Sequence, residues 1–466
     1  MHMSESVITT VVGGLRHGFE KGLTRPEAWR RSQLQKLRLM LIERETDFER
    51  ALHDDLGKAA LESQITEIGF LLGEIDHTLA NLTKWMRPRR VAAPLVVQPA
   101  SAKVILEPLG VALIIAPWNY PLMLALSPLI GAIAAGNSAV VKPSELAPAT
   151  SAALALLMPQ YLDRRAIAVI EGGVPETTEL LEQRFDHIFY TGNGRVGRIV
   201  ARAAAEHLTP VTLELGGKSP VYIDDTVNLA EAARRIVWGK FLNSGQTCVA
   251  PDYVLGRREV LSRLAPKLAD AIHELYGSAV QANPDYGRIV NDAQFTRLVS
   301  YLGDGEIVVG GSHDAAERFI EPTVLAGVSR DSAVMRDEIF GPILPLVEVD
   351  DLGDALSFVA GRDKPLAVYV FSESTEVRRR WELETSSGAL TFGAPVLHLT
   401  VPELPFGGVG ESGQGSYHGE RSFKVFSHEK AVLSKPLALD TLAPTIMPPF
   451  TKTKEKIVRE LLGKLR

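Results

Sequence analysis

The chain has one cysteine among its 466 residues, and the segment around it is suited to nucleophilic chemistry. Cys248 lies in residues 243–251, NSGQTCVAP, among small and polar residues that follow a predicted helix. A lone cysteine is more often an inert buried side chain. A loop of this composition favours an accessible thiolate, the form of cysteine that attacks carbon. No histidine lies near it in the sequence, so a proton acceptor must come from elsewhere in the fold.

Two other side chains have the types that such a nucleophile needs. Asn119 stands between two prolines in residues 116–121, APWNYP. Prolines restrict the backbone on both sides and fix the direction of the amide, as a donor to a developing oxyanion requires, although an isolated asparagine more often satisfies its own turn. Glu214 lies between Leu213 and Leu215 in a pattern that predicts burial. A carboxylate placed in this way is either a paired structural charge or a base with a raised pKa.

Residues 191–197, TGNGRVG, predict a dinucleotide site between a strand and a helix. Gly192, Gly194 and Gly197 form the pattern G-x-G-x-x-G, in which glycines let the backbone approach a pyrophosphate and a helix N-terminus favours its charge. The pattern expects an acidic residue about 20 positions further on, where Glu214 lies. By this interpretation Glu214 binds a ribose. A plain tight turn is the alternative.

Three further segments could bind a ligand. Residues 142–145, KPSE, close a predicted strand at the edge where open parallel sheets bind ligands. Lys142 and Glu145 could hold a ribose there, or form a solvated pair. Residues 336–342, RDEIFGP, form the second segment, and residues 405–419 form the third. The third contains six glycines and suits a loop whose backbone is closely approached.

The elements that must position these residues alternate between strands and helices. Residues 26–85 show helical spacing and predict long surface helices, whose polar faces need no functional explanation. Strands are then expected at 103–107, 111–116, 138–142, 167–171, 187–191 and 211–215. Helices are expected between them at 122–135, 148–162, 177–184 and 195–207. This alternation predicts right-handed crossovers and a doubly wound parallel sheet.

A second alternation begins after Gly216. Its helices are expected at 229–241 and 259–276, and its strands at 323–328, 343–349, 367–371 and 388–392. The fold class is therefore α/β, with two doubly wound parallel-sheet domains.

Composition limits the classes of function. Apolar residues make up 45% and charged residues 23%, which excludes disorder, collagen and coiled coil. The net charge of −6 argues against nucleic-acid binding through a global basic field. A single cysteine cannot form an intrachain disulfide or a cysteine-based zinc site, and no metal is expected. The N-terminus lacks a basic region before its apolar run, so a cytoplasmic location is expected.

Residues 108–141 contain no charge and are long enough to raise the question of a membrane span. Prolines, a glycine and asparagines interrupt them, so they predict a strand, a buried helix and a second strand.

Taken together, these motifs resemble the aldehyde dehydrogenase superfamily over about residues 26–450. The motifs that occur in family order are PWN, KPSE, TGNGRVG, ELGGKSP, GQTC, EIFGP and PFGGVGESG. GQTCVAPDYVL, SYHGERSF and MPPF are most similar to the class 3 branch, which acts on medium-chain, long-chain and aromatic aldehydes. The resemblance implies NAD(P)-dependent oxidation of aldehydes to carboxylic acids through a cysteine thiohemiacetal and thioester, followed by glutamate-assisted hydrolysis.

The resemblance also implies roles for the residues. Cys248 is the nucleophile, Glu214 the general base, and Asn119 with the Cys248 backbone N–H the oxyanion hole. The residues implied to bind the cofactor are Pro117, Trp118, Lys142, Glu145, Gly192, Gly197, Glu338 and Phe340. By this resemblance Lys142 and Glu145, and not Glu214, bind the ribose. NAD is the expected cofactor because Glu145 would repel a 2′-phosphate, and NADP stays possible because the branch often accepts both.

The chain departs from the family pattern at two places. Residues 391–396 read TFGAPV where the branch usually has Asn-Asp, close to the substrate entrance, which leaves the aldehyde open. Gly194 replaces the hydroxyl residue that is common in the turn. An acylating dehydrogenase that uses coenzyme A is an alternative which Glu214 disfavours. A non-catalytic relative is another, disfavoured by the joint presence of Cys248, Glu214 and Asn119.

The expected domains follow from the pattern and the resemblance. Residues 1–90 and 108–214 form a Rossmann-like NAD(P)-binding domain, and residues 215–425 the catalytic domain. Residues 91–107 and 426–437 form a β-rich bridging arm of a homodimer. Residues 438–466 form a tail with six basic and two acidic residues after residue 450 and an apolar stripe that includes Leu465. This tail is expected to dock as a surface helix, with a peripheral membrane contact as the alternative.

Overall fold

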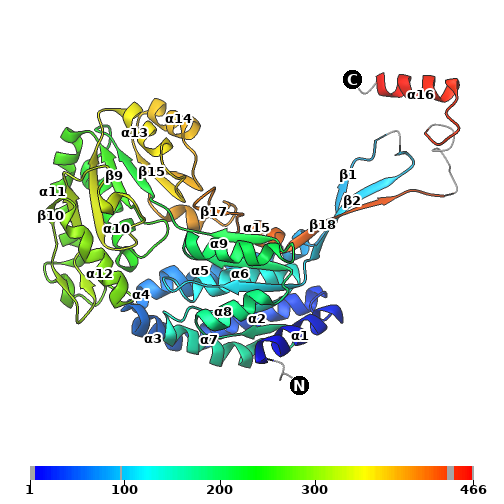
Figure 1. Cartoon of the computed structure of the whole chain (residues 1–466), viewed down its shortest axis with the longest axis horizontal. Helices are drawn as coiled ribbons and strands as arrows, with labels where there is room; N and C mark the ends of the chain where they lie inside the picture. The colour runs from blue at the N-terminus through cyan, green and yellow to red at the C-terminus, as the bar shows by residue number, and fades with distance from the viewer. Residues whose placement is uncertain (1–5, 95–96, 438–445, 464–466) are drawn as a thin grey trace.

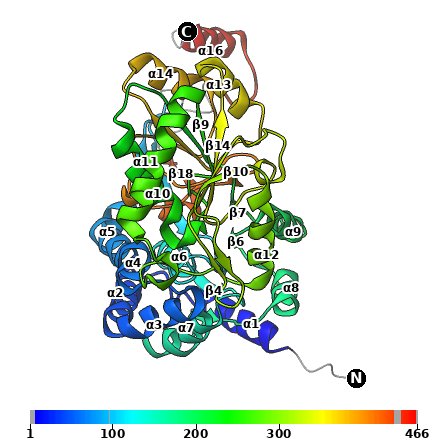
Figure 2. The same ribbon diagram turned by 90° about the vertical axis from the view of Figure 1, so that its left-hand side faces the viewer.

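The computed structural model describes residues 6–94, 97–437 and 446–463, and these form two large parallel sheets and a small projecting one (Figure 1). The two large sheets lie in separate parts of the molecule, each between layers of helices (Figures 1 and 2). The α/β class with two doubly wound sheets is therefore confirmed.

The first sheet has the strand order β17-β7-β6-β3-β4-β5. Its strands are β3 (Val111–Ile115), β4 (Ser138–Lys142), β5 (Ile167–Val169), β6 (His187–Thr191), β7 (Val211–Glu214) and β17 (Gly413–Gln414). All pairs are parallel except β17 with β7. Five of these strands were expected from the sequence, whereas β17 comes from the glycine-rich segment 405–419.

Helices cover both faces of this sheet. They are α1 (Val7–Glu20), α2 (Glu27–Glu43), α3 (Glu45–Leu56), α4 (Ala60–Ser63), α5 (Gly69–Trp85), α6 (Met123–Ala135), α7 (Pro148–Tyr161), α8 (Val174–Glu182) and α9 (Gly194–Ala205). Along β3, Ala112 and Ile114 pack with α6, while Leu113 and Ile115 pack with α1, α8 and α9. This alternation is the period of a strand buried on both faces. The charge-free residues 108–141 are the buried strand, helix and strand that were predicted.

One turn of π-helix, η1 (Gln64–Ile68), interrupts the expected surface helices between α4 and α5. The five-residue turn shifts the helical register, so that Ile65, expected on the apolar face, is 62% exposed, while Glu67 is fully buried. The expectation of surface helices whose polar faces need no functional explanation therefore does not hold at Glu67, nor at Lys58, which is 1% exposed.

The second sheet has the strand order β10-β13-β14-β9-β8-β15-β16. Its strands are β8 (Pro220–Ile223), β9 (Tyr253–Gly256), β10 (Glu306–Val309), β13 (Thr323–Ala326), β14 (Ile343–Glu348), β15 (Ala367–Phe371) and β16 (Ala389–Phe392). Its main helices are α10 (Leu229–Phe241), α11 (Arg258–Tyr276), α12 (Asp292–Ser300), α13 (Leu352–Ala360) and α14 (Thr375–Glu384). A hairpin of β11 (His313–Asp314) and β12 (Phe319–Ile320) lies beside it. The pattern did not predict β8, β9 and β10, although β13 and β16, which are equally short, were predicted.

A three-stranded antiparallel sheet projects from the body (Figure 1). Its strands are β1 (Arg89–Val91), β2 (Ser101–Pro108) and β18 (Ser427–Ser434), and β2 and β18 pair along their whole length. Residues 103–107 were also expected among the strands of the first sheet, and the structure places them in β2 of this projecting sheet instead. The short helix α15 (Glu420–Val425) connects β18 to the body and packs on α6.

The tail contains α16 (Lys452–Gly463), which lies beyond the projecting sheet, apart from both large sheets (Figure 1). The expected docking of this helix on the body is therefore not found in the part of the chain that the structure describes. Residues 438–445 and 464–466, including Leu465 of the predicted stripe, lie outside the described residues. Within the described ranges, the molecule has no helix both long and apolar enough to cross a bilayer.

Candidate active site

A cleft of about 1400 Å³ lies where the ends of β3, β4, β6 and β7 face the loops of the second sheet. Carboxyl ends of parallel strands meet at one edge, which is where open α/β sheets bind ligands. The predicted site residues that line this cleft are Pro117, Trp118, Asn119, Lys142, Glu145, Gly192, Glu214, Cys248, Glu338 and Phe340. The structure thus brings residues from the whole chain to one place.

Gly197 does not line the cleft. It lies on the buried side of α9, where a Cβ atom would stand 2.9 Å from the Leu215 side chain. This glycine lets the helix pack closely on the sheet, which is a role of the third glycine of the fingerprint. Its expected contact with a cofactor is not supported by this position.

The loop that carries Cys248 has an uncommon backbone conformation. Asn243, Ser244 and Gly245 have φ angles of 52°, 53° and 76°. Residues other than glycine rarely adopt this left-handed region, and they keep it only where surrounding contacts enforce it. A Cβ atom at Gly245 would lie 2.3 Å from the Gly341 carbonyl oxygen, so only glycine fits against that backbone.

Hydrogen bonds hold this turn from several directions. The Asn243 N–H donates to Glu62 Oε1 at 2.9 Å. The Gln246 side chain donates to the carbonyl oxygens of Asn243 and Arg288, and it accepts from the Val290 N–H at 3.0 Å. The loop before Cys248 is therefore fixed by its neighbours and not by its own helical propensity.

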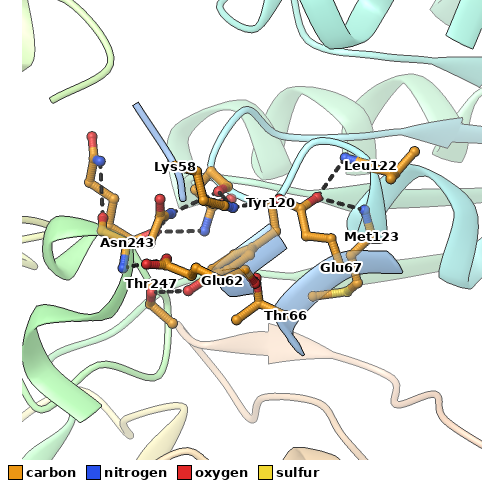
Figure 3. Close-up of polar contacts among 11 residues, drawn as sticks. Lys58, Glu62, Thr66, Glu67, Tyr120, Leu122, Met123, Asn243 and Thr247 are labelled. Carbon is orange, nitrogen blue, oxygen red and sulfur yellow. Dashed lines mark hydrogen bonds and ion pairs between the residues drawn. The ribbon is translucent and has the colours of Figure 1, made fainter. Parts of the chain in front are cut away.

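Asn119 is joined directly to the cysteine loop. Its Nδ2 donates to the Gln246 carbonyl oxygen at 3.0 Å, and its own carbonyl oxygen accepts from Asn243 Nδ2 at 2.8 Å. A carbonyl oxygen can only accept, so the nitrogen of the Asn119 amide faces the loop and keeps a second N–H. The next residue, Tyr120, also contacts the cysteine loop, because its hydroxyl oxygen lies 2.6 Å from that of Thr247 (Figure 3).

Glu214 ends β7 and is 2% exposed. Its carboxylate oxygens have no hydrogen-bond partner among the described residues, and burial raises the pKa of this carboxyl well above its ordinary value. Its main-chain carbonyl oxygen accepts from the Gly192 N–H at 3.0 Å, so the glycine turn lies beside it through the backbone. An unpaired, buried carboxyl in a cleft is a candidate proton acceptor.

The Cys248 thiol is neutral at pH 7 in this environment. Burial raises its pKa most, and the carboxyls of Glu338 and Glu214 raise it further. The backbone N–H groups of Cys248 and Val249 act in the opposite direction. The thiol, Glu214 and Glu338 are therefore electrostatic neighbours within one cleft.

Glu338 and Phe340 form the opposite wall. Burial raises the pKa of Glu338 to about 8, and Asp252 adds to this shift. Gly216 leaves the room for this carboxyl, since a Cβ atom there would lie 1.9 Å from Glu338 Oε2. The Phe340 ring meets the edge of Trp118 with centroids 5.2 Å apart, so residues of the two sheets touch across the cleft.

Lys142 and Glu145 form an ion pair at the end of β4, with Nζ and Oε2 2.6 Å apart. The lysine side chain is 3% exposed and the glutamate side chain 45%, so the ammonium group is buried while its partner carboxylate faces solvent. Nearby, Asn193 caps α9 by accepting from the Val196 N–H at 3.0 Å. The N-terminus of α9 faces the cleft through Gly194 and Arg195, a position that favours a bound phosphate group.

The glycine-rich loop 405–419 approaches the protein's own sheet. Gly413 pairs with Glu214, and a Cβ atom at Gly413 would lie 2.5 Å from the Leu213 carbonyl oxygen. Phe406, Glu411 and Ser412 of this loop line the cleft. The close backbone approach predicted here is therefore one to β7.

Several residues of the site were missed by the sequence analysis. They are Lys58, Glu62, Glu67, Asn243 and Gln246. Three of them come from the first helices, where nothing in the local pattern marks a charge as buried. Asn243 and Gln246 stand in the segment 243–251, but their types alone do not indicate which backbone groups they hold.

Comparison with known proteins gives consistent matches over nearly the whole chain. The model of the aldehyde dehydrogenase family matches residues 11–432. Aldehyde dehydrogenase family 3 member A2 of Mus musculus is 49% identical over 94% of this chain and 91% of its own length. The dimeric NADP-preferring aldehyde dehydrogenase of Canis lupus familiaris is 47% identical over 95% and 98%. The substrate-bound structure of Staphylococcus aureus AldH is 43% identical, with a TM-score of 0.96 over 98% and 100%.

The electrostatics of the cleft predict how Cys248 reacts in the cofactor-free protein. Alkylation by iodoacetamide should be slow at pH 7 and accelerate up to pH 9.5, because the thiol must ionise against its raised pKa. Glu338→Gln should leave the rate near pH 7 unchanged, because Glu338 is largely protonated there. At pH 9 the variant should react about 3- to 10-fold faster, since an ionised Glu338 no longer opposes the thiolate.

The single cysteine makes the intact mass of the protein a direct measure of this reaction. Rapid alkylation that does not change between pH 6 and 9 would contradict the assignment of a neutral thiol. A Glu338→Gln variant that reacts more slowly at pH 9 would contradict the role of Glu338.

Proposed function

Because this chain belongs to the aldehyde dehydrogenase family, we propose that Cys248, Asn119 and Glu214 carry out its reaction, the NAD(P)-dependent oxidation of aldehydes to carboxylic acids. The observation that carries the assignment is the 3.0 Å hydrogen bond between Asn119 Nδ2 and the Gln246 carbonyl oxygen. It ties the predicted oxyanion donor of one sheet to the loop of the predicted nucleophile from the other.

In the first step Cys248 Sγ bonds to the aldehyde carbon after the thiol proton has left. The carbonyl oxygen becomes an oxyanion, which the second N–H of Asn119 and the Cys248 backbone N–H stabilise. The thiol proton passes to water in the cleft, which the partly exposed Cys248 lines, so this step does not depend on Glu214. The nicotinamide, when bound, supplies the hydride acceptor that turns the thiohemiacetal into a thioester.

In the second step water attacks the thioester. Glu214 accepts a proton from this water, the C–S bond breaks, and the carboxylic acid leaves. Burial raises the pKa of this carboxyl, which makes Glu214 a stronger proton acceptor than an exposed carboxylate. The unpaired position of its oxygens keeps Glu214 free for this role among the described residues.

The residues of the cleft fit a dinucleotide cofactor. Lys142 and Glu145 would hold the adenosine ribose, and the turn at Gly192 with the N-terminus of α9 would hold the pyrophosphate. Pro117 and Trp118 would form a wall, and Glu338 and Phe340 would hold the nicotinamide end. We propose NAD as the main cofactor because Glu145 would repel a 2′-phosphate. NADP is accepted as the weaker alternative, in line with the NADP-preferring canine relative.

We propose medium-chain, long-chain or aromatic aldehydes as substrates. The segment expected at the substrate entrance continues into a loop that presents three large aliphatic side chains, each more than 40% exposed, namely Leu397, Val401 and Leu404. Exposed apolar side chains that follow this segment would favour an apolar substrate tail.

The projecting sheet is proposed as the arm of a homodimer. The proposed arm is residues 91–107 and 426–437, beside a proposed NAD(P)-binding domain of residues 1–90 and 108–214 and a proposed catalytic domain of residues 215–425. The strands of the projecting sheet extend slightly beyond these bounds, since β1 begins at Arg89 and β2 ends at Pro108. The strand β18 lies at its edge, and an unpaired edge is a template for pairing with a second chain. The canine relative is dimeric by name. A cytoplasmic location is proposed from the single cysteine, which suits a reducing compartment.

Replacing the proposed base separates the two chemical steps. Glu214→Gln should still attack the aldehyde and transfer hydride, giving a burst of reduced cofactor close to one per active site. Later turnover should be about 10²- to 10⁴-fold slower than in the parent, since water attack lacks its proton acceptor. Stopped-flow absorbance measures the burst, and mass spectrometry of the quenched protein locates the acyl adduct.

Cys248→Ala is the matched control, because it should show no burst and no adduct while it still binds the cofactor. An adduct on any other residue would refute Cys248 as the nucleophile. A Glu214→Gln variant without an adduct, but with a raised KM for the cofactor, would instead assign Glu214 to the ribose. If the parent enzyme turned over rapidly only when coenzyme A was added, and not with water alone, the acylating alternative would be supported.

The cofactor preference should respond to Glu145. Glu145→Gln removes a negative charge beside the proposed ribose site and frees the Lys142 ammonium from its partner. The ratio of kcat/KM for NADP to that for NAD should rise about 5-fold, which corresponds to about 1 kcal/mol in a partly solvated groove. Glu179→Gln, which changes a carboxylate outside the cleft lining, is the control. An unchanged ratio in Glu145→Gln would place the ribose elsewhere.

A further inference from the structure

A buried ion pair lies behind the proposed oxyanion donor. Lys58 Nζ contacts Glu67 Oε1, and both side chains are fully shielded from solvent (Figure 3). Neither residue lines the cleft, and neither takes part in the chemistry proposed above. The pair therefore acts, if at all, through the residues that it contacts.

Glu67 holds one end of the segment that carries Asn119. Its second oxygen, Oε2, accepts from the Leu122 N–H at 2.9 Å and from the Met123 N–H at 3.0 Å, where α6 begins (Figure 3). Carboxylates at helix N-termini satisfy N–H groups that have no partner within the helix. Glu67 therefore fixes where the chain leaves the Asn119 segment.

Lys58 holds the other end of the same segment. Its ammonium group donates to the Asn119 carbonyl oxygen at 3.4 Å and lies 4.3 Å from the centroid of the Tyr120 ring. The pair thus contacts residues 119, 120, 122 and 123 from one side. An apolar pair could fill the same volume, but it could not direct these backbone groups.

The cysteine loop meets the same junction through Glu62. Glu62 Oε1 accepts from the Asn243 N–H (Figure 3). Asn243 Nδ2 in turn donates to the Asn119 carbonyl oxygen. Glu62 and Glu67 are five residues apart, and a π-helical turn brings such residues to one face. In a regular α-helix they would point about 140° apart. The π-helical turn η1 is therefore what allows both carboxylates to face the junction.

Stability alone does not explain the pair. The desolvation of two buried charges offsets much of their attraction, and apolar replacements of similar volume are often as stable or more stable. Loss of one partner is different, because it leaves an unpaired buried charge. A function in positioning is the property that an apolar replacement would lose.

We propose that Lys58 and Glu67 are positioning residues that keep the Asn119 amide aligned with Cys248 while the oxyanion forms. The proposal rests on the oxyanion role of Asn119 in the proposed function. It adds that alignment of the donor depends on a charged pair outside the cleft, supplied by the first helices of the chain.

A double-mutant cycle tests whether Lys58 acts through Asn119. The variants, each made in the Glu214→Gln background that gives the burst, are Lys58→Met, Asn119→Ala and their combination. The readout is the stopped-flow rate constant of the hydride burst at saturating aldehyde and NAD. Lys58→Met alone should slow the burst about 10- to 100-fold, the effect expected for a donor misplaced by about 1 Å. In the Asn119→Ala background the same change should have less than a 2-fold effect, because the amide is already absent.

The cycle distinguishes failure of this proposal from failure of the proposed function. If Asn119→Ala itself leaves the burst unchanged, the oxyanion role is wrong and the positioning role falls with it. If Asn119→Ala slows the burst and adding Lys58→Met slows it by a further 10- to 100-fold, only the positioning role is overturned. The KM for NAD should stay within 2-fold in every variant.

Two further variants separate positioning from folding. Asp55→Asn is the matched control, since buried Asp55 accepts from the N–H groups of Ala149 and Thr150 in the same way but at α7. It should lower the Tm without slowing the burst. Lys58→Met combined with Glu67→Leu removes both charges and should fold even where the single change does not, yet its burst should stay slow. A normal burst rate in that double variant, or a slow one in Asp55→Asn, would overturn the proposal.

Discussion

The site depends on one backbone constraint, the left-handed turn of Asn243, Ser244 and Gly245 before the cysteine. The turn exists because the Gly341 backbone leaves no space for a side chain at Gly245 and because Glu62 and Gln246 hold its polar groups. It carries the Gln246 carbonyl oxygen to Asn119, so it joins the two sheets at the point where chemistry is proposed. The nucleophile and the oxyanion donor therefore become neighbours only in the complete fold.

Burial sets the resting protonation state of the cleft. The pKa values of Cys248, Glu214 and Glu338 are all raised, with desolvation as the largest cause in each case. The carboxyls of Glu338 and Glu214 also raise the pKa of the Cys248 thiol, because a negative charge on either disfavours the thiolate. A cleft of this kind keeps its cysteine unreactive at rest, and it requires that proton transfer accompany each step of the reaction.

The sequence predicted the fold class and brought most of the cleft residues to notice, because both depend on local signals. The strand β3 is a continuous apolar run, and the motifs around Cys248, Asn119 and Glu214 are short and specific. The strands β8, β9 and β10 were missed, because so short a run does not by itself distinguish a strand from other buried or irregular segments. The pair of Lys58 and Glu67 was missed because its burial depends on a π-helical register shift and on contacts 55 or more positions away along the chain. The packing role of Gly197 likewise depends on Leu215 of another element.

The most direct test of the proposed roles of Cys248 and Asn119 is a crystal structure of Glu214→Gln after reaction with an aldehyde and NAD. We expect continuous density from Cys248 Sγ to the acyl carbon, with the acyl oxygen within hydrogen-bond distance of Asn119 Nδ2. The bond between Asn119 Nδ2 and the Gln246 carbonyl oxygen should be retained. An acyl group on another side chain, or an acyl oxygen turned away from Asn119, would contradict the central claim that this loop and this amide form one catalytic unit.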